Sequence, residues 1–313
     1  MDQAATTYGV TEILGLVWTL IVGLGVAAVA AKVFIASYAW AQIPSQVGEL
    51  HQPKLNWVRF GIAVVLTVAL ALGLLNIILE AGKTADWTWF PKYFTQLAHG
   101  LYLSILLLVV SVFFGFLLAV PIGLVQVTGP WPLALLAKGF CTVIRGTPLL
   151  VQLWLLYYGL GSFFPDFPSL RQSFIWPVLI EGFYYAALAL TLSFAGYEGE
   201  IMRGAFLGVP KGELEAARAY GMSPFTTLRR IWLPRAFRIV LPTLGGEVIS
   251  QLKATPLAST VTVMELYGVA GKIKSNTLRT YEPLIMIAVV YFILVYFLNR
   301  AIVTVEKQVP QKR

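Results

Sequence analysis

The sequence predicts an all-α protein that crosses a membrane about seven times. Of its 313 residues, 58% are hydrophobic and only 12% are charged, and the mean hydropathy is +0.76. Several apolar stretches reach the roughly 20 residues that a helix needs to span a bilayer, which excludes a soluble globular domain. The polar residues are instead concentrated in one long interval, residues 203–238. The expected spans are, in chain order, residues 13–36, 60–79, 99–126, 140–163, 178–198, 239–262 and 282–302.

Basic residues are distributed unevenly between the two sides of the membrane. With the N-terminus outside, the cytoplasmic side receives 16 of the 23 Lys and Arg residues, the outside receives 6, and Lys253 lies within a span. Because cytoplasmic loops are enriched in Lys and Arg, this bias predicts an external N-terminus and a cytoplasmic C-terminus. The same bias accounts for the net charge of +8, so we expect a lipid environment and no nucleic-acid partner.

The first two spans form a separable N-terminal extension, which we assign to residues 1–93. Met1-Asp2-Gln3 lacks the positive region of a cleaved signal peptide, so the first span is expected to remain in the membrane. Residues 94–307 then form a core with five spans. The loop between the two parts fits an aromatic belt at the membrane interface or, alternatively, a partner-binding patch. Its aromatic residues are Trp87, Trp89, Phe90 and Tyr93.

The polar interval 203–238 carries seven of the 23 Lys and Arg residues and has the signals of a helical hairpin. Pro210 suits a first helical turn, and residues 212–220 are mostly good helix formers. Gly221 stands where a left-handed residue would end this helix. The interval therefore predicts a first short helix that ends in a hinge.

A second short helix is expected directly after that hinge. Ser223 offers an N-cap oxygen, and Pro224 suits the first helical position. Pro234 is expected to stop the helix. A basic hairpin therefore lies between the fifth and sixth spans.

Specific residues of this hairpin resemble a known motif. Glu215-Ala216-Ala217, three residues, Gly221, nine residues and Ile231-Trp232-Leu233-Pro234 resemble the EAA loop of ABC importer membrane subunits, with every spacing kept. The resemblance implies a cytoplasmic loop that docks into a groove on the ATPase subunit. Small alanines allow close approach, Glu215 supplies an anionic acceptor, and Gly221 allows the turn. The residues expected to contact the ATPase are Glu215, Ala216, Ala217, Gly221, Ile231, Leu233 and Pro234.

The alternative for the hairpin is an amphipathic element that lies on lipid headgroups, which its arginines also favour. That alternative does not require Glu-Ala-Ala, Gly and Leu-Pro at these offsets. The arginines concerned are Arg218, Arg229, Arg230, Arg235 and Arg238.

From residue 94 to residue 307 the chain resembles the permeases of polar amino acid ABC importers. The stretches that carry this resemblance are residues 145–152, 197–203 and 253–266, beside the EAA loop. It implies a type I ABC importer permease fold in the bacterial inner membrane. It also implies a homodimer or a heterodimer with a second permease, a pair of ATPase subunits and an extracytoplasmic solute-binding protein. Residues 262–271 resemble permeases for basic amino acids and opines, which favours such a substrate.

Two short motifs at the expected cytoplasmic side admit simple structural explanations. In Arg145-Gly146-Thr147-Pro148, Pro148 suits a first helical turn, Thr147 a cap, and Arg145 can reach the interface. By resemblance, the motif alternatively packs beside the translocation path. Glu200 and Arg203 stand three residues apart on one helix, so we expect them to pair and position the polar loop.

The sixth span is the best candidate for the translocation pathway. Glu247, Gln251 and Thr255 are spaced four apart and share one helical face, which must point toward protein or water. Lys253 lies roughly 15 Å into the span, and a charge there costs at least about 2.5 kcal/mol on insertion scales. We expect Glu247, Gln251, Lys253 and Thr255 to line the path, with a lysine that ties helices together as the alternative for Lys253.

The same span is expected to be broken at Pro256. Proline has no backbone donor, so the carbonyl of Leu252 loses its helical partner. Broken helices with polar side chains form the midplane sites of many transporters. The chain departs here from the family pattern Lys-Asp-Thr-Ser-Leu, because it has Ala254 and Pro256 in place of Asp and Ser.

No cofactor, metal or catalytic site is expected in this chain. Residues 81–84 (Ala-Gly-Lys-Thr) match the end of an ATP-binding loop, but Ile77 stands where its first glycine belongs and an apolar span precedes it. The single cysteine, Cys141, and the isolated His51 and His99 offer no metal cluster or catalytic triad. We expect ATP to bind a partner subunit only.

The sequence therefore predicts a membrane-spanning permease subunit, not an enzyme, of an ATP-driven importer for polar L-amino acids. A stand-alone ion-coupled secondary transporter is the alternative, and it predicts transport without an ATPase and an inverted repeat that is not visible in the sequence. A membrane scaffold that uses the hairpin only for docking is a third possibility. Neither alternative accounts for the spacing of the EAA-like residues.

Overall fold

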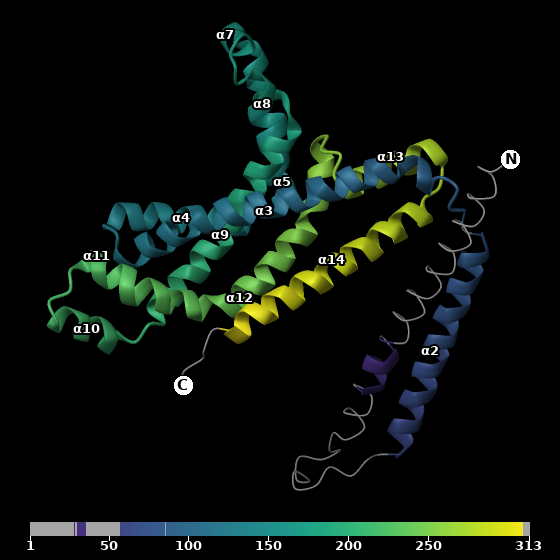
Figure 1. The fold of residues 1–313 in the computed structure, drawn as a ribbon, viewed down its shortest axis with the longest axis horizontal. Coiled ribbons are helices and arrows are strands. Elements are labelled where there is room, and N and C mark those ends of the chain that lie inside the picture. Colours follow the sequence, from purple (N-terminus) through teal and green to yellow (C-terminus); the bar gives the residue numbers. More distant parts are fainter. Residues whose placement is uncertain (1–27, 29, 36–56, 85, 309–313) are drawn as a thin grey trace. The chain divides into compact units, whose positions relative to one another are not determined.

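The computed structural model describes residues 28, 30–35, 57–84 and 86–308, and every regular element in these ranges is helical (Figure 1). The chain divides into two compact units, Met1–Lys92 and Tyr93–Arg313. Of the first expected span, residues 13–36, only residues 28 and 30–35 are among the described residues, and they are helical.

The first unit contains helix α2, Trp57–Thr84, which covers the second expected span. Ala63 and Thr67 lie one turn apart on its buried face, and the Thr67 hydroxyl donates to the Ala63 carbonyl at 2.7 Å. The indole rings of Trp87 and Trp89 lie 5.9 Å apart, and both side chains are buried. These two tryptophans therefore differ from the exposed aromatic belt that the sequence suggests.

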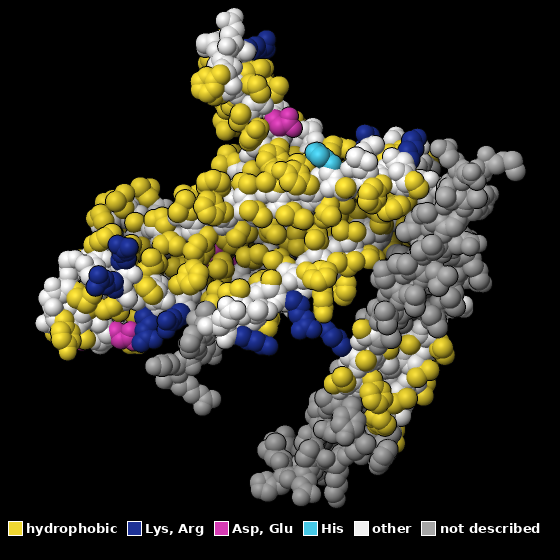
Figure 2. All heavy atoms as spheres, in the orientation of Figure 1, with side chains coloured by type: hydrophobic (Ala, Val, Ile, Leu, Met, Phe, Trp, Pro, Cys, Tyr) yellow, Lys and Arg dark blue, Asp and Glu magenta, His cyan; other side chains and the backbone are white. Residues whose placement is uncertain are grey.

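The second unit is a helical body whose long elements are α3, α9, α12 and α14. Their bounds are α3 Phe90–Thr128, which begins just before the unit, α9 Gly182–Leu207, α12 Leu233–Ala254 and α14 Tyr281–Gln308. Medium and short helices connect them: α4 Trp131–Gly146, α5 Leu149–Trp154, α6 Gly161–Phe163, α7 Pro168–Arg171, α8 Trp176–Ile180, α10 Lys211–Ala219, α11 Pro224–Thr227 and α13 Leu266–Thr277. Figure 2 shows that apolar side chains cover most of the visible surface of this body.

Helix α9 is the centre of the body, and close approach to its neighbours depends on small residues. A Cβ atom on Gly196 would lie 2.5 Å from Cγ2 of Ile144 in α4. A Cβ on Gly199 would lie 2.7 Å from Cγ2 of Ile122 in α3. Small residues at such crossings let helix backbones pack closely, which is the main source of attraction between helices in a bilayer. The two glycines therefore allow α3 and α4 to pack against α9.

Two apolar clusters hold the ends of α9. One surrounds Leu107, Leu153 and Leu190 and joins α3, α5 and α9 to the turn after α12. The other surrounds Met202, Phe206 and Val240 and joins α3, α9 and α12. Leu107, Leu153, Leu190, Met202 and Phe206 are almost completely inaccessible to solvent.

By length and composition, α3 and α14 are suited to cross a membrane, and α4 together with residues 149–166 is suited as one bent span. Helices α9 and α12 are more polar. Their glycine, serine, threonine and charged residues are partly covered by other helices of the same chain. This difference agrees with a polytopic fold in which the central helices avoid lipid.

The fourth expected span, residues 140–163, is not a single helix. The chain bends by 105° between α4 and the segment that begins at Leu149. Pro148 is the N-cap of α5 instead of a first-turn residue, and Thr147 before it is extended at φ −114° and ψ 142°. This is the conformation that a following proline imposes. The Gln152 amide secures the bend by donating to the carbonyl oxygens of Ile144 at 2.8 Å and Thr147 at 3.0 Å.

Helix α13 is an element that the sequence analysis does not predict. It lies in the segment between the sixth and seventh expected spans, and Glu265 caps its first turn by accepting from the amides of Tyr267 and Gly268. Thr262 and Leu278, on either side, adopt left-handed backbone conformations with φ of 68° and 58°. Both are residue types that rarely adopt this conformation, so the sequence gives no signal for the ends of α13.

Candidate functional site

The first half of the polar hairpin folds as the sequence predicts, except that Pro210 is the N-cap of α10 instead of a first-turn residue. Helix α10 ends at Ala219, and Gly221 follows with φ +70°. The amide of Gly221 donates to the Arg218 carbonyl at 2.9 Å, and the amide of Met222 donates to the Ala217 carbonyl at 3.1 Å. This pair of hydrogen bonds is the Schellman motif, which satisfies the last carbonyls of a helix. Gly221 is therefore the hinge that turns the chain back toward α11.

The second half confirms the predicted start but not the predicted end. The Ser223 hydroxyl accepts from the Thr226 amide at 3.3 Å, and Pro224 is at the start of α11. Pro234, however, does not stop the helix: a π-helical turn, Leu228–Trp232, leads directly into α12. The amide of Leu233 there bonds to the Leu228 carbonyl. Local π geometry accommodates proline within membrane helices, so the hairpin and the sixth span are mechanically continuous.

An open groove of about 500 Å³ lies between the two arms of the hairpin. Its lining combines small and apolar residues of the EAA-like pattern with basic residues. The lining residues are Glu213, Ala216, Ala217, Tyr220, Met222, Arg230, Ile231, Pro234, Arg235 and Arg238. The structure thus brings together four of the seven predicted contact residues. The other three residues are not part of this lining. Glu215 on α10 and Gly221 after its end are exposed, and Leu233 is half-buried.

The hairpin is attached to the body at two points. Arg235 at the start of α12 donates two hydrogen bonds to the Glu213 carboxylate on α10, at 2.8 and 2.6 Å. The Trp232 indole donates to the Phe206 carbonyl of α9 at 2.9 Å, and its ring packs on the Phe206 ring with centroids 5.4 Å apart. These contacts connect both arms of the hairpin to the spans.

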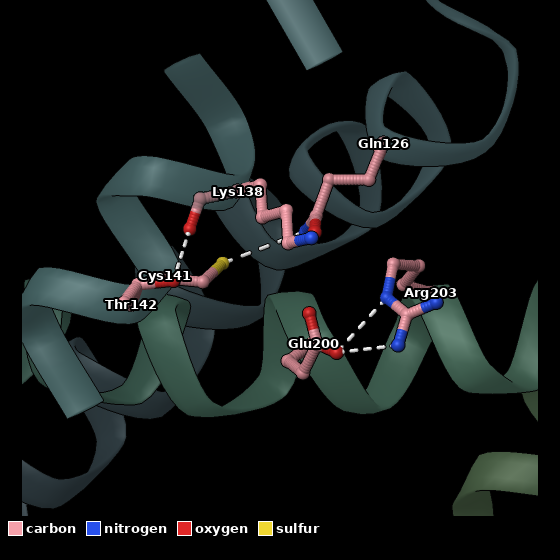
Figure 3. A network of polar contacts seen from close by, with 6 residues as sticks. All are labelled: Gln126, Lys138, Cys141, Thr142, Glu200 and Arg203. Carbon is pink, nitrogen blue, oxygen red and sulfur yellow. Dashed lines mark hydrogen bonds and ion pairs between the residues drawn. The ribbon is translucent and has the colours of Figure 1, made fainter. Parts of the chain in front are cut away.

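The expected pair Glu200–Arg203 is present at the end of α9. Arg203 donates through Nε to Glu200 Oε1 at 2.9 Å and contacts it also through Nη2 (Figure 3). The hydrogen bonds from Arg203 lower the pKa of the Glu200 carboxyl, and the positive charges of Arg203, Arg145 and Lys138 lower it further. The Arg145 guanidinium lies over the Tyr197 ring at 5.7 Å. Glu200 is therefore an acid placed among three basic residues.

Gln251 and Thr255, on the expected polar face of the sixth span, are buried and make contacts within the chain. The Gln251 amide donates to Ser111 Oγ at 3.1 Å and to the Leu190 carbonyl at 2.9 Å. The Thr255 hydroxyl donates to the Leu252 carbonyl at 2.9 Å. The α-helix ends at Ala254, and a 3₁₀ segment, Thr255–Val261, follows, so the expected break at Pro256 is present and Thr255 satisfies the freed carbonyl.

Lys253 and Glu247 are placed differently from these two. Lys253 is exposed on the chain, and its ammonium contacts no acid among the described residues. Glu247 is half-buried. The four predicted pathway residues therefore do not line one common surface of the isolated chain.

The structure also places buried acids that the sequence analysis did not single out as site residues. Glu265 is fully buried, and its carboxylate accepts from Ser104 Oγ and from the Tyr291 hydroxyl, each at 3.2 Å. Tyr291 also lies 3.1 Å from the Thr255 hydroxyl. This network joins α3, α13, α14 and the broken end of α12. A lone Glu between apolar residues gives no local signal of such a role.

Glu198 is the second such acid. Its side chain is fully buried in α9, and neither carboxylate oxygen has a hydrogen-bond partner among the described residues.

Comparison with known proteins agrees with this arrangement. Residues 111–309 match the family of binding-protein-dependent transport system inner membrane components. The chain belongs to this family. It is 42% identical over 229 residues to the octopine transport system permease protein of Rhizobium radiobacter. The aligned stretch covers 73% of this chain and 92% of that protein. It is 37% identical over 226 residues to the histidine/lysine/arginine/ornithine transport system permease protein of Salmonella typhimurium, covering 72% and 92%.

Solved structures show the same fold. A crystal structure of an amino acid ABC transporter with histidines superposes with a TM-score of 0.62 at 32% identity, covering 72% of this chain and all of that one. A methionine ABC transporter structure superposes with a TM-score of 0.58 at 21% identity, which supports the fold alone. The chain is thus a multi-pass permease subunit of an ABC importer, and in such systems ATP hydrolysis belongs to a separate subunit. Residues 1–110 precede the stretch that matches the family.

Proposed function

We propose that this permease forms the membrane path of an ATP-driven importer for polar L-amino acids, with a preference for basic amino acids or opines. The observation that carries the proposal is the groove between α10 and the start of α12, in which Ala216, Ala217, Ile231 and Pro234 come together. The names of the relatives, which include octopine and histidine/lysine/arginine/ornithine permeases, support the substrate class.

The expected partners are two ATPase subunits, an extracytoplasmic solute-binding protein and a second permease, either another copy or a similar chain. A groove lined by small and apolar residues together with arginines suits the close approach of a protein surface that carries acidic groups. We infer that the hairpin faces the cytoplasm, with the N-terminus outside and the C-terminus inside, because the Lys and Arg bias gives this orientation.

The mechanism we infer is a two-state movement of the hairpin. Closure of the ATPase pair on ATP shifts the hairpin, and the continuous helix from Pro224 through α12 transmits this shift to the spans. The spans then change from inward-facing to outward-facing, which lets the binding protein release its substrate. Hydrolysis reverses the change and delivers the substrate to the cytoplasm. Both ATP and the loaded binding protein bias the same equilibrium.

Within the path, Lys253 is the residue we propose to contact polar groups of the substrate. Its ammonium is exposed and close to the break in α12. Gln251 and Thr255 contribute by holding the broken helix against α3, α9 and α14. Glu247, which lies one turn before Gln251, is the fourth residue of this proposed region.

Purification of the tagged chain from its native membrane tests the proposal. The unmodified chain should retain an ATPase subunit, and Glu215→Lys should lose most of it. Glu181→Lys is the matched control, because Glu181 is an exposed acid between α8 and α9, far from the hairpin in the sequence. Absence of an ATPase from both the unmodified chain and the control, under conditions that preserve a known ABC complex, would support the ion-coupled alternative. Uptake by liposomes without ATP would then establish it.

A further inference from the structure

A second open pocket, of about 350 Å³, lies where the end of α3, the start of α4 and the last turns of α9 meet. It is lined by Gln126, Trp131, Ala134, Leu135, Lys138 and Arg203. None of these residues lines the hairpin groove, so the pocket is a separate feature. Figure 3 shows Gln126, Lys138 and Arg203 reaching toward this region from their three helices.

The charge of the pocket is positive. Glu200 is the acid beside it, and it is surrounded by Arg203, Arg145 and Lys138. Arg203 uses Nε and Nη2 for Glu200, which leaves Nη1 available. The ammonium of Lys138 makes no hydrogen bond or ion pair with any residue that the structure describes. Lys138 thus carries an uncompensated positive charge at the pocket, and Arg203, although paired with Glu200, keeps a free N–H donor beside it, which suits an anion.

The polar floor and the apolar wall further restrict the ligand. Gln126 lines the pocket, and within the described part of the chain its buried carboxamide oxygen accepts no hydrogen bond. On the other side, Trp131 and Leu135 are exposed, with 76% and 54% of their surface accessible. A soluble anion does not need this apolar wall. A molecule with an anionic head and a hydrocarbon tail would use both parts.

The position of the pocket agrees with a membrane interface. Arg203 lies one turn before the end of α9, and α3 ends at Thr128 beside the start of α4. The pocket is therefore at the hairpin side of the spans, at the level where headgroups meet helix ends. Basic pockets between membrane helices on the cytoplasmic side are typical binding places for anionic lipid headgroups.

We propose that this pocket binds one anionic phospholipid. Its phosphodiester lies between Lys138 and Arg203, a headgroup hydroxyl donates to Gln126, and an acyl chain runs along Trp131 and Leu135. Phosphatidylglycerol has each of these groups. A zwitterionic phosphatidylcholine lacks both the net charge and the hydroxyl. The inference does not depend on which substrate is transported.

Native mass spectrometry of the full chain, purified with the subunits it retains, tests this site. Phosphatidylglycerol and phosphatidylcholine are added in turn to delipidated protein, and the fraction with one bound lipid is measured for Lys138→Gln. Lys307→Gln is the matched control, because it removes one exposed positive charge near the end of α14. We expect phosphatidylglycerol to bind Lys138→Gln roughly fivefold more weakly than it binds the unmodified chain, because one basic side chain near an anionic surface contributes about 1 kcal/mol. Binding to the control should be unchanged.

Three results would overturn the proposal. Equal retention of the two lipids would show that charge and hydroxyl are not recognised, and an equal loss in Lys307→Gln would show general attraction to the basic surface. Displacement of the lipid by millimolar inorganic phosphate would identify a free anion as the ligand. Trp131→Ala provides an independent check, since it should weaken lipid binding and leave any phosphate binding unchanged. Equal thermal unfolding of all variants confirms that each chain is folded.

Discussion

Arg235 of α12 holds the carboxylate of Glu213 in α10 with two parallel hydrogen bonds, from Nε at 2.8 Å and from Nη2 at 2.6 Å. The two residues are 22 positions apart and belong to opposite arms of the hairpin. A two-bond contact between a guanidinium and a carboxylate restrains both distance and relative orientation. The arm that carries Glu-Ala-Ala is thereby tied to the start of α12, and we expect a displacement of α10 to move the start of that helix.

We expect Glu213→Gln to impair this transmission without unfolding the chain. Both side chains are partly exposed, so the pair should contribute no more than about 1 kcal/mol to the free energy of unfolding. ATP-dependent uptake should nevertheless fall severalfold, while the ATPase subunit still co-purifies. The charge-swapped double variant, Glu213→Arg with Arg235→Glu, should recover part of the uptake. Uptake that is unchanged in the single variant would show that the pair has no part in coupling.

Removal of the Gln251 amide should lower the stability of the folded chain. Gln251→Leu leaves the Ser111 hydroxyl without this partner and the Leu190 carbonyl without the amide that it accepts, both in the interior. Leaving such groups unsatisfied should lower the free energy of unfolding by about 1–3 kcal/mol. Thermal unfolding in detergent, compared with Ser250→Ala at a neighbouring exposed position, measures the effect. An unfolding midpoint equal to that of the control would contradict a structural role for Gln251.

Removal of the Lys253 ammonium should lower substrate uptake and not stability. Because its ammonium is exposed and has no described acidic partner, Lys253→Met should leave thermal unfolding nearly unchanged. If the ammonium binds substrate, uptake should fall roughly tenfold, the loss expected for one hydrogen bond to a charged group. Lys253→Arg should retain more activity than Lys253→Met. Wild-type rate and affinity in Lys253→Met would instead identify Lys253 as a residue that serves only structure.

The close crossing of α4 and α9 should depend on Gly196. Gly196→Ala would place a methyl group 2.5 Å from Ile144, so the helices must separate, and we expect a loss of about 1–3 kcal/mol. Gly204→Ala is the control on the same helix, because nothing lies within 4 Å of the position that its Cβ would take. The control should be neutral or slightly stabilising. Similar unfolding midpoints for the two variants would refute the requirement for glycine at the crossing.

Local features of the hairpin were predictable because they depend on residues within one or two turns of each other. The left-handed Gly221 and the cap at Ser223 both follow from hydrogen bonds between near neighbours. The expected pair Glu200–Arg203 is likewise three residues apart. The prediction that Pro234 ends the helix is wrong because the rule behind it considers α-helical geometry alone, and a π-helical turn precedes this proline.

The sequence by itself determined that the chain is helical and membrane-spanning. It also determined the position of the polar hairpin and the EAA-like spacing within it. Hydropathy and short-range spacing are properties of consecutive residues, so they can be read without the fold. Tertiary structure alone decided which polar residues of the sixth span are buried by other helices. Gln251 and Thr255 turn inward to Ser111, Leu190 and Tyr291, whereas Lys253 remains exposed. It also decided that Glu265 joins α13 to α3 and α14. These contacts join residues 26 to 161 positions apart, so they exist only once the helices have packed.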